Sequence, residues 1–301
     1  MTPTLPKNPL DRGPKPPFPP QGQQPPGLES KMNPLPDFGE QSYIGHGRLT
    51  GKAAIVTGGD SGIGRAVALA FAREGADVCI SYLSEDSDAA TSQQVVEQAG
   101  RKAIAIRGDI GDERHCQRIV QQAVQTFGHL DILVNNAGFQ MYRPNLEEQP
   151  SDEIEHTFRT NILAMFWLVK AALPHMQPGS AIVNTASIEA FKANPALTAY
   201  ASTKGAIIAF TTSLAQQLVK KGIRVNAVAP GPVWTPLIVA SKPPELLKKQ
   251  ESQPLKFGSS DPEQRPAQPA ELAPAYVFLA SPEASYVNGC VLSVTGGEPM
   301  P

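Results

Sequence analysis

The chain has 301 residues, of which 41% are hydrophobic, and a formal net charge of −2 at pH 7. This length suffices for one α/β domain of about 250 residues, and the near-neutral charge provides no basic field for nucleic acid or an anionic membrane. The three cysteines and five histidines show no metal-ligand spacing, which predicts no disulfide framework and no metal site. The sequence shows neither a signal peptide nor a long apolar run, and we therefore expect a cytoplasmic protein.

Residues 1–48 are expected to form a proline-rich N-terminal arm, in front of a catalytic domain at 49–301. The first 36 residues hold twelve of the 30 prolines and show no apolar period. Proline removes backbone donors and favours extended, polyproline-like segments. Three interpretations are open: a disordered tail, an arm that contacts a neighbouring subunit, and a PxxP ligand for another domain.

After residue 48, short β-branched runs alternate with longer runs of helical period. The predicted strands are 52–57, 77–82, 102–107, 131–134, 180–185, 223–229 and 291–294, and the predicted helices are 62–74, 89–99, 114–127, 152–176, 199–220 and 267–280. Alternation of apolar strands with helices predicts a seven-stranded parallel sheet covered on both faces. Right-handed crossovers then give a single doubly wound α/β domain of the Rossmann type.

A glycine-rich turn, TGGDSGIG, joins the first predicted strand to the first helix. Glycine is needed where such a turn requires positive φ and where the backbone must approach a diphosphate, and the helix N-terminus offers free N–H groups. No Lys-Ser/Thr pair follows the last glycine, so this is not a Walker loop. The turn predicts a dinucleotide site made of Thr57, Gly58, Asp60, Ser61, Gly62, Ile63 and Gly64.

The end of the second predicted strand bears on the choice between NAD and NADP. An Asp or Glu there would bond the adenosine 2′-hydroxyl and repel a 2′-phosphate. The strand ends at Tyr82, and no carboxylate follows until Glu85. This pattern favours NADP and leaves NAD open. Arg65, at the helix start, is either a partner for a phosphate or a solvated surface residue.

Two other strand ends are expected to contact the cofactor. Asp109 and Ile110 follow the third strand, where the aspartate is either an adenine-binding residue or a helix cap. Asn136, Ala137 and Gly138 follow the fourth strand. Small residues at the carboxyl edge of such a sheet let the backbone come close to a ligand.

Tyr200 and Lys204 are four residues apart in a predicted helix, so both side chains lie on one face. A phenol has a pKa of ~10, which a nearby ammonium lowers. Ser187, at the end of the fifth strand, would be a second donor to a carbonyl oxygen. Downstream of a dinucleotide turn, the trio predicts transfer of a hydride and a proton. Because a Tyr-x-x-x-Lys spacing also arises by chance, the order of all the motifs carries this prediction.

The order of these motifs, ending with Pro230 and Gly231, resembles the short-chain dehydrogenase/reductase family over residues 49–301. The lead-in at 36–49 resembles a subgroup with an extended N-terminus that includes bacterial aldehyde reductases and general-stress or glucose-dehydrogenase-like proteins. The resemblance implies that Asn161 is a fourth catalytic residue, which distorts its helix and holds a water that connects the lysine to solvent. It further implies a homotetramer and cofactor contacts from Lys204, Tyr200, Pro230, Gly231, Val233 and Thr235.

Loops after the middle strands are expected to line a substrate pocket with Gln140, Glu189, Phe191 and Trp234, although both aromatics are equally consistent with packing. A few polar groups in an apolar wall suit a small carbonyl or the end of a polyol. The stretch 256–265 is predicted to be a surface loop that borders the lid of the active site. The expected function is hydride transfer between NAD(P)H and a small aldehyde, ketone or sugar. A non-catalytic NAD(P)-binding sensor or scaffold is the alternative.

Overall fold

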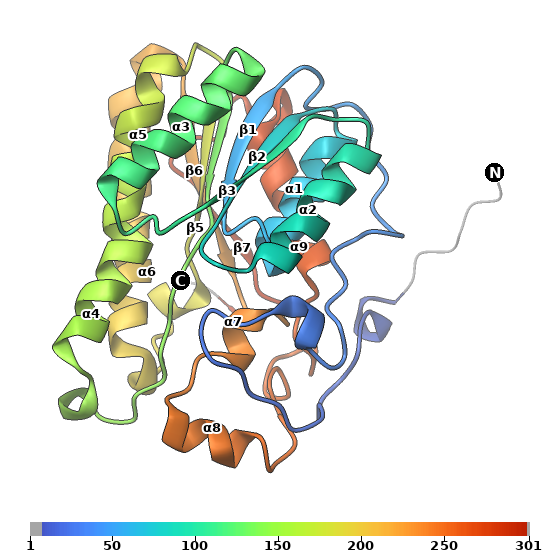
Figure 1. Cartoon of the computed structure of the whole chain (residues 1–301), viewed down its shortest axis with the longest axis vertical. Helices are drawn as coiled ribbons and strands as arrows, with labels where there is room; N and C mark the ends of the chain where they lie inside the picture. Colours follow the sequence, from blue (N-terminus) through green and yellow to red (C-terminus); the bar gives the residue numbers. More distant parts are fainter. Residues whose placement is uncertain (1–7, 300–301) are drawn as a thin grey trace.

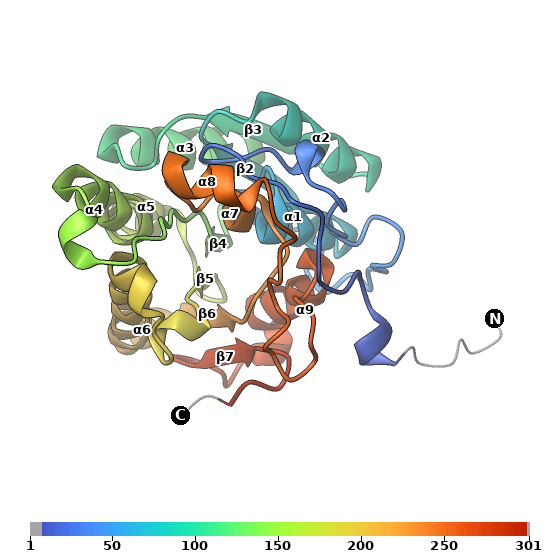
Figure 2. The same cartoon turned by 90° about the horizontal axis from the view of Figure 1, so that it is seen from below.

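The computed structural model describes residues 8–299 and has one seven-stranded sheet with helices on both faces (Figures 1 and 2). The strands are β1 (Ala53–Thr57), β2 (Asp77–Tyr82), β3 (Ala103–Arg107), β4 (Ile132–Asn135), β5 (Ala181–Thr185), β6 (Arg224–Pro230) and β7 (Val291–Val294). All neighbouring strands pair in parallel, in the order β3-β2-β1-β4-β5-β6-β7. The predicted doubly wound α/β fold is confirmed.

The helices form two layers, with α1, α2 and α9 on one face of the sheet and α3, α5 and α6 on the other (Figure 1). Their bounds are α1 (Gly62–Arg73), α2 (Asp86–Gln98), α3 (Glu113–Phe127), α4 (Ser151–Phe158), α5 (Ala164–Ala172), α6 (Thr198–Leu218), α7 (Pro236–Val239), α8 (Pro244–Gln250) and α9 (Pro269–Ala280). Successive residues of each strand point to opposite faces, so the strands fill both cores. Cys79, for example, is fully buried against the α3 side, as its apolar run predicts.

Strand β1 lies between β2 and β4, so the chain leaves β1 toward one edge of the sheet and later returns to the other. Loops diverge at the carboxyl end of such a switch point and leave a crevice where α/β proteins bind ligands. The β1–α1 turn and the loop after β4 border this crevice from opposite sides. The topology therefore brings together the motifs that the sequence singled out.

The helix predicted at 152–176 is interrupted. Helix α4 ends at Phe158, a π-helical turn occupies Arg159–Leu163, and α5 begins at Ala164. The chain then tightens into a 3₁₀ turn at Leu173–His175. π-Turns inside helices often mark functional positions, and Asn161 lies at the centre of this one. Apolar periodicity alone does not reveal such an insertion, because the flanking turns keep the helical spacing.

The described part of the arm packs against its own domain and runs beside α7 and α8 in both views (Figures 1 and 2). Phe18 stacks on Trp234 with ring centroids 4.1 Å apart, and its backbone pairs with that of Leu255. The indole N–H of Trp234 donates to the carbonyl oxygen of Pro34 at 2.9 Å. Over residues 8–48 the arm is thus not a free tail. Its first seven residues lie outside the described part, and contact with a neighbouring subunit stays a prediction.

The stretch 256–265 is a loop beside α8, as predicted, but it also contributes one residue to the cavity wall and one to the interior. Phe257 lines the central cavity, and Arg265 is buried. The guanidinium of Arg265 pairs with Glu271 at 2.7 Å and donates to the carbonyl oxygen of Pro9 at 3.1 Å. A buried, fully engaged arginine therefore ties this loop to the arm and to α9.

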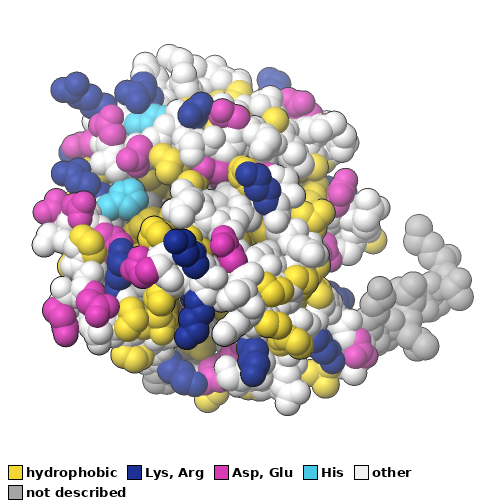
Figure 3. Space-filling model, turned by 60° about the horizontal axis from the view of Figure 1, so that its bottom comes forward, with side chains coloured by type: hydrophobic (Ala, Val, Ile, Leu, Met, Phe, Trp, Pro, Cys, Tyr) yellow, Lys and Arg dark blue, Asp and Glu magenta, His cyan; other side chains and the backbone are white. Residues whose placement is uncertain are grey.

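Acidic and basic side chains are interspersed over the face shown in Figure 3, with no large patch of a single sign. That distribution agrees with the formal net charge of −2. Within residues 8–299, no helix has the length and apolarity needed to cross a membrane.

Candidate active site

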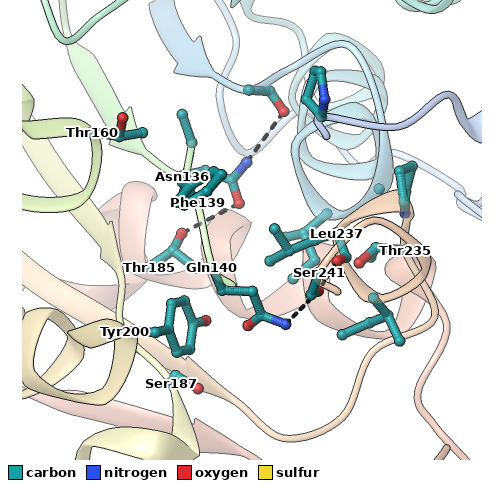
Figure 4. A pocket seen from close by; sticks show the side chains of 18 of the residues that line it. Asn136, Phe139, Gln140, Thr160, Thr185, Ser187, Tyr200, Thr235, Leu237 and Ser241 are labelled. Carbon is teal, nitrogen blue, oxygen red and sulfur yellow. Dashed lines mark hydrogen bonds between the residues drawn. The ribbon is translucent and has the colours of Figure 1, made fainter. Parts of the chain in front are cut away.

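A cavity of about 470 Å³ opens at the carboxyl ends of the strands. Its wall comes from the β1–α1 turn, the loops after β2 to β6, the start of α6, the α7 region and two arm residues, Pro26 and Gly27. Figure 4 shows Tyr200 and Ser187 on one side of this space, with Thr235, Leu237 and Ser241 opposite them. Segments far apart in the sequence therefore meet around one space.

The β1–α1 turn packs closely on itself and on the β4 loop because its glycines lack side chains. Gly58 has φ +60°, and a Cβ there would lie 3.0 Å from the Cα of Ala137. A Cβ on Gly64 would lie 1.9 Å from the carbonyl oxygen of Gly58. At the start of α1 the N–H of Gly62 donates to the carboxylate of Glu29 at 2.5 Å, so this helix N-terminus already binds one anionic group. The glycine pattern of the turn is the one typical of dinucleotide-binding turns.

Most of the residues expected to contact a cofactor line the cavity. Those are Gly58, Asp60, Ser61, Gly62, Ile63, Tyr82, Asp109, Ile110, Asn136, Ala137, Gly138, Tyr200, Lys204, Pro230, Gly231, Val233 and Thr235. Thr57 and Gly64 do not reach the wall. Instead, the hydroxyl of Thr57 accepts hydrogen bonds from the N–H groups of Asn136 (3.0 Å) and Ala137 (3.1 Å). Thr57 therefore fixes the β4 loop against the turn.

Hydrogen bonds exclude the helix-cap interpretation of Asp109, whose contact with adenine stays a prediction, and they also decide the role of Arg65. A carboxylate oxygen of Asp109 accepts from the N–H of Gly111 at 2.7 Å while the residue also lines the cavity, and the N-cap of α3 is Asp112 instead. Arg65 is neither solvated nor free for a phosphate. It is 4% exposed and forms ion pairs with Glu29 and Asp88.

Tyr200, Lys204 and Ser187 meet in the cavity, as the sequence predicts. The first two come from neighbouring turns of α6, and Ser187 follows β5. The Lys204 Nζ lies 5.2 Å from the centroid of the Tyr200 ring and donates to the carbonyl oxygen of Thr185 at 2.8 Å. The Ser187 hydroxyl accepts from the N–H of Glu189 at 3.2 Å, which orients it.

Burial favours the uncharged form of each titratable member of this trio. It raises the pKa of the Tyr200 phenol above its ordinary range, against an opposing interaction with the Ser187 hydroxyl. It lowers the pKa of Lys204 to about 7. The phenol therefore keeps its proton at neutral pH, against the expectation that the ammonium lowers its pKa, whereas the amine changes charge near neutral pH.

Asn161 lies behind the cavity wall and connects three segments. Its side-chain oxygen accepts from the N–H of Phe139 at 2.8 Å, and its amide donates to the Phe139 carbonyl at 2.9 Å and to the Thr203 hydroxyl at 3.0 Å. A Cβ on Gly138 would lie 3.6 Å from the Asn161 Oδ1 and 3.8 Å from the Lys204 Nζ. The π-turn thus brings this amide next to the lysine.

Two of the four expected pocket residues line the cavity, and two do not. Gln140 donates to the Ser241 hydroxyl at 2.8 Å, which joins the β4 loop to the α7 region (Figure 4). Glu189 also lines the cavity, and burial raises the pKa of its carboxyl. Trp234 is instead fully buried against Phe18, and Phe191 packs on an apolar cluster beside α6. Both aromatics were expected in the wall because they follow the middle strands, with packing as the open alternative; the structure shows the packing.

Several wall residues were not expected from the sequence. They are Pro26, Gly27, Tyr142, His156, Ser241, Lys242 and Phe257. The sequence around Pro26 and Gly27 of the arm does not indicate a cavity contact, because a proline–glycine pair is typical of any turn. Among the described residues, no group of three or more His, Cys, Asp or Glu side chains is arranged to hold a metal ion.

Comparison with known proteins assigns the chain to a family. A family model described as enoyl-(acyl carrier protein) reductase matches residues 58–298. The chain is 52% identical to "Uncharacterized oxidoreductase YhdF" of Bacillus subtilis, over 96% of this chain and 98% of that protein. It is 47% identical to "Glucose and ribitol dehydrogenase" of Daucus carota, over 93% of this chain and 96% of the relative.

A solved short-chain dehydrogenase of Burkholderia cenocepacia, in complex with NADP, superimposes with a TM-score of 0.75 and is 35% identical, covering 83% of this chain and 98% of its own. The extent of these matches agrees with the strand order and with the glycine turn described above. The chain therefore belongs to the short-chain dehydrogenase/reductase family and is an NAD(P)-dependent oxidoreductase.

Proposed function

We propose that the protein interconverts an alcohol with a small aldehyde, ketone or sugar carbonyl, with Tyr200 as the general acid and base. The observation that carries this proposal is the meeting of Tyr200, Ser187 and Lys204 in the cavity that the glycine turn also borders. When bound, the nicotinamide supplies or accepts the hydride. The residues of this chain then bind the substrate, orient its oxygen and move the proton.

In the reducing direction, the Tyr200 phenol donates its proton to the substrate oxygen as negative charge develops there. Ser187 is the second donor to that oxygen, and such a donor acts most strongly where water is excluded. Protonated Lys204 stabilises the phenolate that remains. Asn161 ties Phe139 of the β4 loop to Thr203 of α6, the residue before the lysine, through the bonds described above.

The proposed cofactor site follows the cavity wall from the β1–α1 turn to the segment after β6, with Gly62, Ile63, Asn136 and Thr235 among its contacts. The proposed substrate pocket has polar side chains, among them Gln140 and Glu189, beside apolar ones such as Leu237. This mixture suits a hydroxylated substrate, and the relative named for glucose and ribitol oxidation supports a sugar or polyol.

The test is a parallel assay with NADH and NADPH over aldehydes, diketones and sugars, in wild type and Tyr200→Phe. The phenylalanine keeps the ring but removes the proton, so we expect kcat to fall by roughly 10³-fold while dinucleotide affinity stays within about twofold. Wild-type kcat in Tyr200→Phe would refute the mechanism. Tight dinucleotide binding with no turnover of any substrate in wild type would instead favour a sensor or scaffold.

We also expect a cytoplasmic homotetramer, in which the arm contacts a neighbouring subunit. The family resemblance supports the tetramer, and the position of the arm on the outside of its own domain supports the contact. Light scattering of the full chain and of a variant without residues 1–40 measures both. An unchanged mass and thermal stability of the truncated protein would remove the reason to assign the arm to an interface.

A further inference from the structure

Residues 23–29 of the arm connect two sides of the cavity, α7 and the β1–α1 turn, and Figure 2 shows the arm passing between α7 and α2. At one end, the N–H of Gln23 donates to the carbonyl oxygen of Val239 in α7 at 2.9 Å. At the other end, the carboxylate of Glu29 accepts from the N–H of Gly62 at 2.5 Å. The segment is therefore attached at both ends, to different parts of the domain.

Glu29 anchors the segment on the side of the turn. It is 2% exposed, its carboxylate forms an ion pair with Arg65, and its N–H donates to a carboxylate oxygen of Asp88 in α2 at 2.6 Å. The Arg65 guanidinium donates in turn to the backbone oxygen of Asp60 at 2.9 and 2.6 Å. Glu29 therefore holds the turn at two points, directly at Gly62 and indirectly through Arg65.

The arm crosses the domain where α7 meets the turn. Gly27 has φ +84°, and a Cβ there would lie 3.1 Å from the Cβ of Ala240 and 3.3 Å from that of Pro236, so this approach requires a glycine. Pro236 also lies beside the turn, because a Cβ on Gly62 would be 3.8 Å from its Cδ. Pro26 and Gly27 line the cavity. The turn, α7 and the arm therefore close one side of the cavity together.

The segment between the two attachments is shaped by one side chain. The side-chain amide of Gln23 donates to the carbonyl oxygen of Leu28 at 3.0 Å, and its side-chain oxygen accepts from the N–H of Leu28 at 2.7 Å. These two bonds close residues 23–28 into a loop. A segment that is attached through a few hydrogen bonds opens locally while the rest of the domain stays folded. Loss of the Gln23 side chain should therefore loosen the segment without unfolding the sheet.

We propose that residues 23–29 form a strap across the dinucleotide site. Pro26 and Gly27 belong to the wall of that site, and the strap holds the β1–α1 turn and α7 together, so that it must loosen before a dinucleotide enters or leaves. The inference rests on the proposed dinucleotide site. Opening of a closing segment limits turnover in many enzymes. A strap formed by the same chain needs no neighbouring subunit, so this role of the arm is separate from the expected subunit contact.

The test is a stopped-flow experiment that follows the fluorescence of NADH and of NADPH as each binds to wild type and to Gln23→Ala. Alanine removes both side-chain bonds to Leu28 and changes no residue of the cavity wall. Two lost hydrogen bonds favour opening by a factor of about ten, so we expect the association and dissociation rate constants each to rise roughly tenfold, with the dissociation constant within about threefold of wild type. The faster association is decisive, because a site that is only damaged binds more slowly or more weakly.

Gln24→Ala, at the exposed neighbouring residue, is the matched control and leaves both rate constants unchanged. Hydrogen exchange of wild type is the second measurement and carries the test if Gln23→Ala does not fold. Bound dinucleotide should slow exchange of the N–H groups of Leu28 and Glu29. An unchanged association rate constant in folded Gln23→Ala, or equal exchange with and without dinucleotide, would overturn the strap alone. Failure of wild type to bind either dinucleotide would also overturn the proposed function.

Discussion

The two sides of the cavity are built differently. The floor consists of strand ends and of α6, where Tyr200, Lys204 and Asn136 are held by neighbouring backbone through bonds such as Lys204 to Thr185. The roof consists of the arm, α7, α8 and the loop before α9. Its bonds join segments as distant as 200 residues for Trp234 with Pro34, and 256 residues for Arg265 with Pro9. The floor thus carries the chemistry, and the roof depends on long-range packing.

This difference has a thermodynamic meaning. Floor residues sit on strands whose ladders the whole sheet supports, so they are lost only when the domain unfolds. The roof has no sheet ladder, and it is held by hydrogen bonds between segments that are distant in the chain. Substitutions in the floor should therefore change turnover, whereas substitutions in the roof should change stability and substrate access.

Glu29→Ala tests the attachment of the arm and has the largest expected effect on stability. It leaves the buried guanidinium of Arg65 without its arm partner, and breaking one side of a buried ion pair costs about 3–5 kcal/mol. Urea denaturation measures the free energy of unfolding. The double variant Glu29→Ala/Arg65→Met is the control and should recover part of the loss. A loss below about 1 kcal/mol would mean that the arm is not tied to α1 in this way.

Phe18→Ala removes the ring that stacks on Trp234 and should loosen the roof. Deleting a buried phenylalanine costs about 3 kcal/mol where the whole domain depends on it, but here part of that cost should appear as local opening. We expect faster hydrogen exchange across α7 and α8 and a KM that rises several-fold more than kcat falls. Leu35→Ala, at an arm residue that is 63% exposed, is the matched control. Equal effects of the two variants would contradict the division between roof and floor.

Lys204→Met tests the floor, where activity and stability should change in opposite directions. Burial lowers the pKa of Lys204 to about 7, whereas an unfolded lysine has a pKa of ~10.4. Between these pH values the unfolded chain therefore binds more protons than the folded protein. The free energy of unfolding falls as pH falls from about 10 to about 7, and the destabilisation by Lys204 is largest at the lower end of this range. Methionine removes that cost, and we expect a gain on the order of 1–3 kcal/mol at pH 7 with loss of turnover.

Thermal denaturation of Lys204→Met and wild type at pH 7 and at pH 9.5 measures this effect. The difference in Tm should amount to a few degrees at pH 7 and shrink at the higher pH. A gain that does not depend on pH would assign the effect to packing. A loss of stability at pH 7 would show that the bond from the Lys204 Nζ to the Thr185 carbonyl outweighs the desolvation of the ammonium.

Much of the floor was predictable because its signals are local. The turn at 57–64 lies directly between β1 and α1, and Tyr200 and Lys204 share a helix face by their spacing alone. The interruption at Asn161 was implied only by the family resemblance, because an asparagine before an apolar run gives no sign of a π-turn. Trp234 was misplaced for the same kind of reason, since its burial depends on Phe18, which lies more than 200 residues earlier.

By itself, the sequence determined the parallel sheet and most of the residues that meet at its carboxyl edge, because apolar periodicity and strand-to-helix turns are properties of neighbouring residues. Only the tertiary structure decided where the arm goes and which side chains hold Arg65. Those outcomes depend on charges and rings that are distant in the chain and become neighbours only after the sheet has formed.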